Sequence, residues 1–339
     1  MKVERWMRRG FLGGTARRAA VALCVLTLVG SVSAQEVSPA NPRTPEQIID
    51  QLIKVMENKG IDPRRQQQQC DRLIDELSKL GDKAIPAIKS VVVGAKLYVQ
   101  DALMNSLGEI NTPLATDTLL EFALRRDDKL VSEVAISRLS LRTIHRPLSQ
   151  NEFSQLETKL KTDPEPQALS NAKFLARCRQ NDITRRAKAI IARFIWQLNH
   201  PPKFRVFDSY VSSEAWWCNA YILCLLEMDQ ARVRKLLKDE LEKAKSKRVA
   251  TWLTIASGML GEESLAEELC RIVESEPDIS VRAMALSGYA MAVKGKAIPF
   301  LRRFINYRIP GAADSKSNYS NPLQIAARDE LARLEEKRP

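Results

Sequence analysis

"GDKAIPAIK" at residues 81–89 and "GKAIPFLRR" at residues 295–303 share the tetrapeptide Lys-Ala-Ile-Pro. In the first copy a helical run ends at Gly81, and Pro86 follows five residues later. Glycine commonly ends a helix, and proline fits the first turn of the next helix because the amides there have no helical acceptor. Both stretches therefore predict the turn between two consecutive helices.

The same unit recurs along the chain. "YVQDALMNSLG" ends at Gly108, 27 residues after Gly81, and Pro113 again follows five residues later. A second pattern also repeats: an apolar residue lies eight positions before a bulky residue, and a small residue follows the bulky one. The first residues of these units are Val99, Val131, Trp252 and Val281. Helix pairs that repeat at about 30 residues are typical of an α-solenoid.

We therefore expect an all-α fold, an α-solenoid (superhelix) of about seven helix pairs. The composition agrees, since glycine is sparse and runs rich in Ala, Leu, Glu, Lys and Arg favour helices. Helices at 46–58 and 322–336 are expected to cap the two ends, because an uncovered last repeat leaves an apolar face in water. The predicted pairs span 66–93, 97–125, 129–161, 166–199, 213–244, 247–275 and 279–306.

Units of the form V-x-x-A-x-x-x-x-L-G, followed by a turn and A-I-P-x-L, resemble the short HEAT-like repeats of the bacterial phycobilisome-lyase type. The match is good at 77–125 and 279–305 and fair at 247–275. From 141 to 245 only the apolar periodicity predicts helices. The resemblance covers about half of the mature chain and implies a scaffold, with no activity attached. HEAT-like folds include DNA glycosylases with a basic groove, but an exported protein meets little DNA.

Residues 1–34 predict a cleaved export signal. Five arginines precede an uncharged run whose apolar core is shorter than the roughly 20 residues that span a bilayer. The run ends with small residues, which predicts cleavage after Ala34 and a periplasmic or secreted mature protein. "RRGFLGG" resembles the twin-arginine motif, while Arg17-Arg18 suits Sec export, so both routes stay open. An uncleaved membrane anchor is the alternative.

Residues 35–45, "QEVSPANPRTP", predict a flexible linker because they contain three prolines and no periodic apolar face. The solenoid domain is then expected over 46–339, with Thr44 and Pro45 starting its first helix. Removal of the signal lowers the formal net charge from +12 to +7. Much of the basic character therefore belongs to the signal, and we expect no nucleic-acid partner and no stable transmembrane segment after cleavage.

The sequence offers few groups for catalysis or metal binding. It contains no CxxC, GxSxG or HExxH motif and no phosphate-binding glycine loop. The two histidines, His145 and His200, lie in proline-containing turns and are too few for a histidine metal cluster. Pairs such as Asp127-Asp128 would point about 100° apart on a helix and form no acid–base site by themselves. We expect no enzyme activity, no metal and no cofactor.

Five cysteines remain after cleavage, an odd number for an oxidising compartment: Cys70, Cys178, Cys218, Cys224 and Cys270. We expect most of them to be buried as small apolar side chains. A Cys178–Cys218 bridge between neighbouring helices is the alternative.

Two features are candidates for binding. Trp216 and Trp217 are consecutive in "SEAWWCNAYILCLL", and on a helix they can hardly both face one core. The two alternatives are that both pack in the core or that at least one of them belongs to a binding patch. Basic clusters around Arg185 and Arg186, and around Arg302 and Arg303, would form a groove for an acidic partner if they converged. A solvated face is the alternative. The remaining members of these clusters are Arg177, Arg179, Lys188, Arg193 and Arg308.

The sequence as a whole predicts an exported HEAT-repeat scaffold that binds another macromolecule on its concave surface, with a protein as the preferred partner. The alternative is a binder of anionic glycan or lipid in the cell envelope, whose affinity would fall steeply with salt. An enzyme of unknown type is the second alternative.

Overall fold

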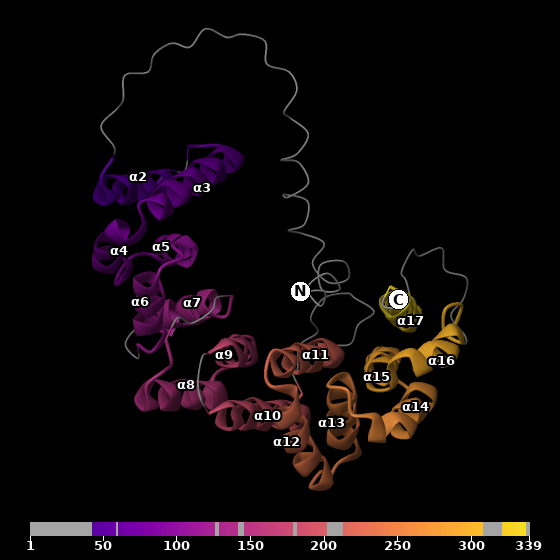
Figure 1. The fold of residues 1–339 in the computed structure, drawn as a ribbon. Helices are drawn as coiled ribbons and strands as arrows, with labels where there is room; N and C mark the ends of the chain where they lie inside the picture. The colour runs from indigo at the N-terminus through magenta and orange to yellow at the C-terminus, as the bar shows by residue number, and fades with distance from the viewer. Residues whose placement is uncertain are drawn as a thin grey trace, which may run out of the picture. The chain divides into compact units, whose positions relative to one another are not determined.

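The computed structural model describes residues 43–58, 60–125, 129–141, 146–178, 182–201, 213–307 and 321–336. The predicted signal, its cleavage site at Ala34 and most of the predicted linker lie outside these ranges. The described helices belong to one compact unit that begins at Arg43. Within the described ranges the fold is all-α, without a strand (Figure 1).

All seven predicted helix pairs are present, and a further helix stands at each end where a cap was expected. The pairs are α3 (Pro63–Lys79) with α4 (Ile85–Val92), α5 (Leu97–Glu109) with α6 (Pro113–Ala123), α7 (Lys129–Leu139) with α8 (Gln150–Thr162), α9 (Glu165–Arg177) with α10 (Ile183–Asn199), α11 (Ser213–Leu226) with α12 (Gln230–Glu242), α13 (Lys247–Met259) with α14 (Ala266–Ser275), and α15 (Ile279–Val293) with α16 (Ile298–Arg302). The end helices are α2 (Pro45–Glu57) and α17 (Pro322–Glu335).

The helices form two layers. In the odd-numbered layer each helix packs on the next one, from α3 through α17. In the even-numbered layer α2 packs on α4, α8 on α10 and α10 on α12. Packing of α6 on α7 and of α14 on α15 is more extensive than packing within the pairs α5–α6 and α13–α14. The same helices can therefore also be grouped as eight pairs, α2–α3 through α16–α17, which makes the end helices members of the repeat.

The core lies between the layers and is continuous along the described helices. Burial of Cys70, Cys178, Cys218 and Cys224 confirms their expected role as small apolar side chains. All five cysteines are free, so the alternative of a Cys178–Cys218 bridge is wrong. Burial raises the pKa of the Cys178 and Cys224 thiols to about 12, which leaves them unreactive near neutral pH. No helix in the described part of the chain has the length and apolar character needed to cross a bilayer.

The first helix begins where the sequence predicts. The Thr44 hydroxyl accepts a hydrogen bond from the Gln47 amide, and the Gln47 side chain accepts one from the Thr44 amide, while Pro45 occupies the first turn. Arg43 Nε donates to Glu76 of α3 over 2.9 Å. The last residues of the predicted linker therefore pack with the solenoid.

The two Lys-Ala-Ile-Pro stretches adopt the same local structure. A 3₁₀ turn, Gly81–Ala84 or Lys294–Ala297, precedes each short helix, and Pro86 and Pro299 lie in the first turns of α4 and α16 as predicted. Gly81 opens its turn with φ +61°. In the second copy the equivalent position is Lys294, with φ +55°, because the glycine stands one residue later. A side chain in this left-handed region costs roughly 1–2 kcal/mol.

Because glycine occupies this position in the first turn and lysine occupies it in the second, substitutions at the two turns should have opposite effects. Lys294→Gly should raise the free energy of unfolding by about 1 kcal/mol because it removes the left-handed strain. Gly81→Ala should lower it by about 1 kcal/mol, since an added Cβ meets nothing within 4 Å and only the backbone strain remains. Urea unfolding measures both. Changes of the same sign would contradict the backbone explanation.

An arginine links two repeats at the start of α8. Arg146 bonds Asp117 of α6 over 2.8 Å and Glu152 of α8 over 2.7 Å, while Glu152 also accepts from the Ser149 amide over 2.7 Å. The hydrogen bond from Arg146 is the main cause that lowers the pKa of Glu152 to about 2, against the opposing effect of burial. The carboxylate form is therefore favoured in the folded chain.

The pKa of Glu152 is lower in the folded chain than in the unfolded chain. The ionised Glu152 therefore stabilises the folded chain above pH 4.5, and this stabilisation is lost as the pH falls towards 2. We expect the wild-type chain to lose about 1 kcal/mol more than Glu152→Gln across this window, a figure reduced for solvent screening. Urea unfolding at closely spaced acid pH values tests this. Parallel pH profiles for the two proteins would refute the linkage.

Candidate functional site

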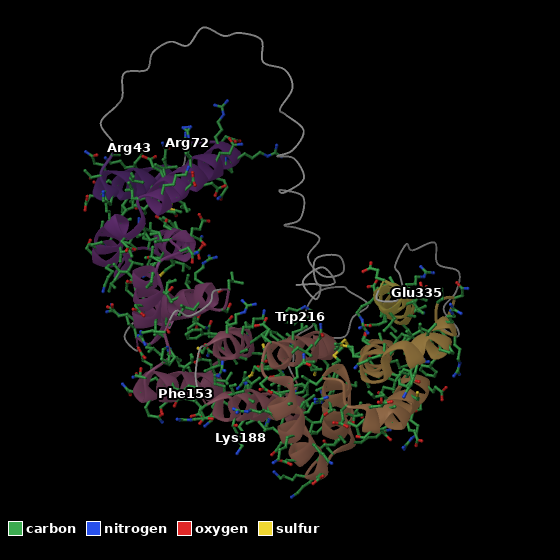
Figure 2. All side chains as sticks on the ribbon, viewed as in Figure 1. Arg43, Arg72, Phe153, Lys188, Trp216 and Glu335 are labelled. Atoms are coloured by element: carbon green, nitrogen blue, oxygen red, sulfur yellow. The ribbon has the colours of Figure 1, made fainter. Side chains whose placement is uncertain are left out.

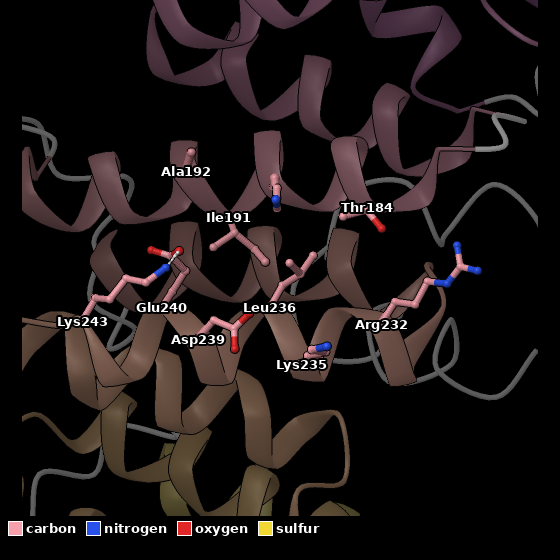
Figure 3. Close-up of a pocket in the computed structure, with 10 residues that line it drawn as sticks. Thr184, Ile191, Ala192, Arg232, Lys235, Leu236, Asp239, Glu240 and Lys243 are labelled. Carbon is pink, nitrogen blue, oxygen red and sulfur yellow. Dashed lines mark hydrogen bonds and ion pairs between the residues drawn. The ribbon is translucent and has the colours of Figure 1, made fainter.

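A groove runs between α10 and α12 in the even-numbered layer (Figure 3). Its volume is about 640 Å³. The described residues that line it are Thr184, Lys188, Ile191 and Ala192 from α10, Arg232, Lys235, Leu236, Asp239 and Glu240 from α12, and Lys243 directly after α12. We call it the α10–α12 groove.

The groove forms because two helices present matching faces. Lining residues recur at spacings of three and four on each helix, which places them on one side. Thr184 and Arg232 stand at one end and Ala192 and Lys243 at the other, so the helices run parallel (Figure 3). Ile191 is buried and Leu236 is half-buried. The floor is therefore apolar.

Charged side chains stand along both walls. Lys188, Arg232 and Lys235 are exposed, and none of them forms an ion pair with any described residue. Lys243 at the other end pairs with Glu240 over 2.9 Å. With four cationic and two anionic lining residues, the groove carries a formal charge of +2. The cations concentrate where α10 and α12 begin.

Two arginines of the first predicted cluster are buried and serve the fold. Arg186 donates to the carbonyl oxygens of Leu175, Ala176 and Cys178, which caps the end of α9. Arg193 is 4% exposed and is held in the core. Neither guanidinium can reach a partner from these positions, and we place neither in a binding surface.

Three further predicted arginines, Arg185, Arg302 and Arg303, already have partners on the surface. Arg185 bonds Glu157 over 3.0 Å and lies over the Phe153 ring. Arg302 lies 3.8 Å from Glu335, and Arg303 bonds Glu274 over 3.0 Å.

The two predicted clusters do not converge. The cluster around Arg185 belongs to α10 and the cluster around Arg302 to α16, and Figure 2 shows Lys188 of α10 well away from Glu335, the partner of Arg302. Arg179 and Arg308 lie outside the described residues. Of the described members of both clusters, Lys188 alone lines the α10–α12 groove.

The tryptophans separate in a similar way. Trp217 is buried, Trp216 is half-buried, and their rings meet edge to face at 4.5 Å. Core packing therefore accounts for Trp217. Trp216 belongs to the odd-numbered layer, on the side away from Lys188 (Figure 2).

Among the described residues, the most exposed tryptophan lies on α10. Trp196 of α10 is 45% exposed; its ring covers the Arg193 guanidinium at 4.2 Å and stacks on His200 at 4.4 Å. Lys188, Ala192 and Trp196 follow one another at spacings of four, a signal that was readable in the sequence. Trp196 lies one turn beyond Ala192 and is not among the residues that line the groove.

A polar network lies beneath this face. Arg193 pairs with Glu165 over 3.0 Å and donates to the carbonyl oxygens of Lys161 and Asp163, and the Tyr221 hydroxyl donates to Glu165 over 2.9 Å. Burial raises the pKa of Glu165, while the bonds from Tyr221 and Arg193 oppose that rise. Because these groups are buried, the network joins α9, α10 and α11 and offers no access to a substrate.

No protein-family model matches the chain, and no curated protein matches it in sequence. Among the described residues, no three His, Cys, Asp or Glu side chains stand close enough to hold a metal ion. Function must therefore be argued from the helix stack and the α10–α12 groove.

Proposed function

We propose that the chain is an exported HEAT-like repeat scaffold that binds another macromolecule, with a protein as the preferred partner. The observation that supports it is the two-layer stack of helix pairs across residues 43–336. Such a stack grows by adding neighbours, so it presents long rows of surface helices for the size of its core. Proteins built this way commonly serve as binding surfaces.

The α10–α12 groove favours a protein over other partners. It joins an apolar floor, formed by Ile191 and Leu236, to charged walls of both signs. Apolar centres with polar rims are the usual composition of protein interfaces. We therefore propose the α10–α12 groove as the binding surface, in place of a groove formed by the two predicted arginine clusters.

The test is in-cell cross-linking of the tagged full-length chain, followed by mass spectrometry and reconstitution with the purified candidate partner. We expect a protein that cross-links saturably and binds the purified chain in a fixed ratio. The control is the same tag and export signal on an unrelated domain. The mass of the exported product reports cleavage after Ala34.

An anionic glycan or lipid of the envelope is the second candidate, favoured by the groove cations that form no ion pair with a described residue. It predicts retention on envelope material that high salt releases, with no saturable protein partner. That result would replace the proposed function.

A further inference from the structure

We propose that the α10–α12 groove binds an acidic segment of a partner protein, with the carboxylates of that segment at the end where Lys188, Arg232 and Lys235 stand. This inference deepens the proposed function and rests on its choice of a protein partner. It adds the chemistry that the partner must present and the direction in which the segment lies.

Charge complementarity is the first argument. Lys188 lies in the second turn of α10, and Arg232 and Lys235 lie in the first two turns of α12. These three cations are exposed and form no ion pair with any described residue. A carboxylate placed between the helices would meet charges from both walls.

The two helix starts add to this polarity. Because α10 and α12 run parallel, both positive dipole ends lie beside the three cations (Figure 3). Asp182 and Asp229 also stand at this end, but their carboxylates accept from the amides of Arg185 and Arg232 over 2.9 and 3.1 Å. These aspartates cap the helices. The side chains of Lys188, Arg232 and Lys235 therefore remain available to bind carboxylates of a partner.

The far end of the groove argues against a uniformly anionic partner. Asp239 and the Glu240–Lys243 pair line it, so a polyanionic glycan or a membrane surface would meet carboxylates there. A peptide can instead place acids at one end and apolar side chains along the floor of Ile191 and Leu236. A volume of about 640 Å³ accommodates several side chains.

Trp196 extends the apolar part of the surface. It lies one turn beyond Ala192 on the same face of α10, with nearly half of its area exposed. Tryptophan is enriched among residues that dominate binding energy at protein interfaces. The order along α10 is therefore Lys188, Ala192 and Trp196, which matches a segment that runs from acidic to apolar.

The test measures fluorescence anisotropy of labelled peptides with the mature chain. The probes are a short peptide with three glutamates followed by leucines and alanines, the same peptide with glutamines, and the peptide in reversed order. The groove variant is Lys188→Gln/Arg232→Gln/Lys235→Gln. The matched control is Arg64→Gln/Arg65→Gln/Arg72→Gln, which removes the same charge from three exposed arginines of α3 that, like the groove cations, form no ion pair with any described residue. Circular dichroism melting confirms that each variant is folded.

We expect the glutamate-first peptide to bind the wild-type chain at least about tenfold more tightly than the glutamine or the reversed peptide. The groove variant should lose at least about tenfold in affinity, and the matched control should stay within about twofold. Trp196→Ala should weaken the same peptide without changing its preference for glutamate.

Three results would overturn the inference: no measurable binding of the glutamate-first peptide, equal losses in the groove and control variants, or tighter binding of heparin fragments or phosphatidylglycerol vesicles. If cross-linking still yields a saturable protein partner whose affinity ignores the groove variant, the proposed function stands and only this assignment fails. If no protein partner exists, the proposed function fails with it.

Discussion

Replacing Arg193 by methionine should lower the free energy of unfolding by about 4 kcal/mol, because it leaves a buried carboxylate without its cation. Arg193 and Glu165 are 3% and 8% exposed in their side chains and pair at 3.0 Å. The same substitution also removes the donors to the carbonyl oxygens of Lys161 and Asp163. Thermal and urea unfolding of the purified chain measure the loss.

The control for this result lies on the same helix. Arg185→Met removes a half-buried pair with Glu157 and should cost less than about 1 kcal/mol. The double variant Arg193→Met/Glu165→Gln should recover part of the stability, because it no longer buries an unpaired charge. Equal losses of unfolding free energy at positions 185 and 193 would contradict a stabilising role for the buried Arg193–Glu165 pair. A double variant that recovers no stability would contradict it as well.

The pH dependence of the same variant has a definite sign. Burial already raises the pKa of Glu165, and without Arg193 that pKa should rise further. A carboxyl with a raised folded pKa binds a proton more tightly in the folded chain, so its unfavourable contribution appears as the pH rises above the unfolded value. The deficit of Arg193→Met relative to wild type should therefore shrink as the pH is lowered from 8 towards 5.

The helix pairs could be predicted from local signals. The glycine stops, the prolines five residues later and the eight-residue register predicted the pairs towards the two ends, and apolar periodicity alone predicted those at 141–245. These signals act over one or two helical turns, so they can be recognised in the sequence without knowledge of which helices pack together.

The positions of the arginines depend on packing and were harder to predict. Grouped by composition, Arg186 and Arg193 appear as part of a basic surface. Placed on the helix face, they stand seven residues apart in line with Ile190, and all three are buried. Their burial also required acceptors on α8 and α9, which the sequence of α10 does not reveal.

The candidate site was predictable only in part. Lys188 was named within the first basic cluster, but Arg232 and Lys235 belong to a helix more than 40 residues later. Their meeting across the groove arises because alternate helices stack in the even-numbered layer. The curvature and twist that align α10 with α12 follow from many small packing contacts, and no short motif encodes them.

A glycine of α13 allows a close contact with the next repeat. An added Cβ at Gly258 of α13 would lie 2.6 Å from Leu269 Cδ1 and 3.2 Å from the backbone of Gly288 in α15. Real Cβ atoms do not approach another atom to 2.6 Å, and two of the three atoms met are backbone atoms. Gly258→Ala should therefore lower the free energy of unfolding by about 2 kcal/mol, although alanine favours helix more than glycine does.

Two further glycines turn this into a graded test by urea unfolding. Gly288→Ala brings its Cβ to 3.2 Å from the Ile255 carbonyl oxygen and 3.4 Å from Leu269, so its loss should be smaller than that at Gly258. Gly108→Ala meets only the flexible side chain of Arg138, at 3.3 Å, and should cost less than about 0.5 kcal/mol or stabilise its helix. An order other than 258, 288, 108 would mean that the spacing of α13 and α15 adjusts freely. If the order holds, close approach at Gly258 and Gly288 fixes how one repeat stacks on the next near the C-terminal end of the solenoid.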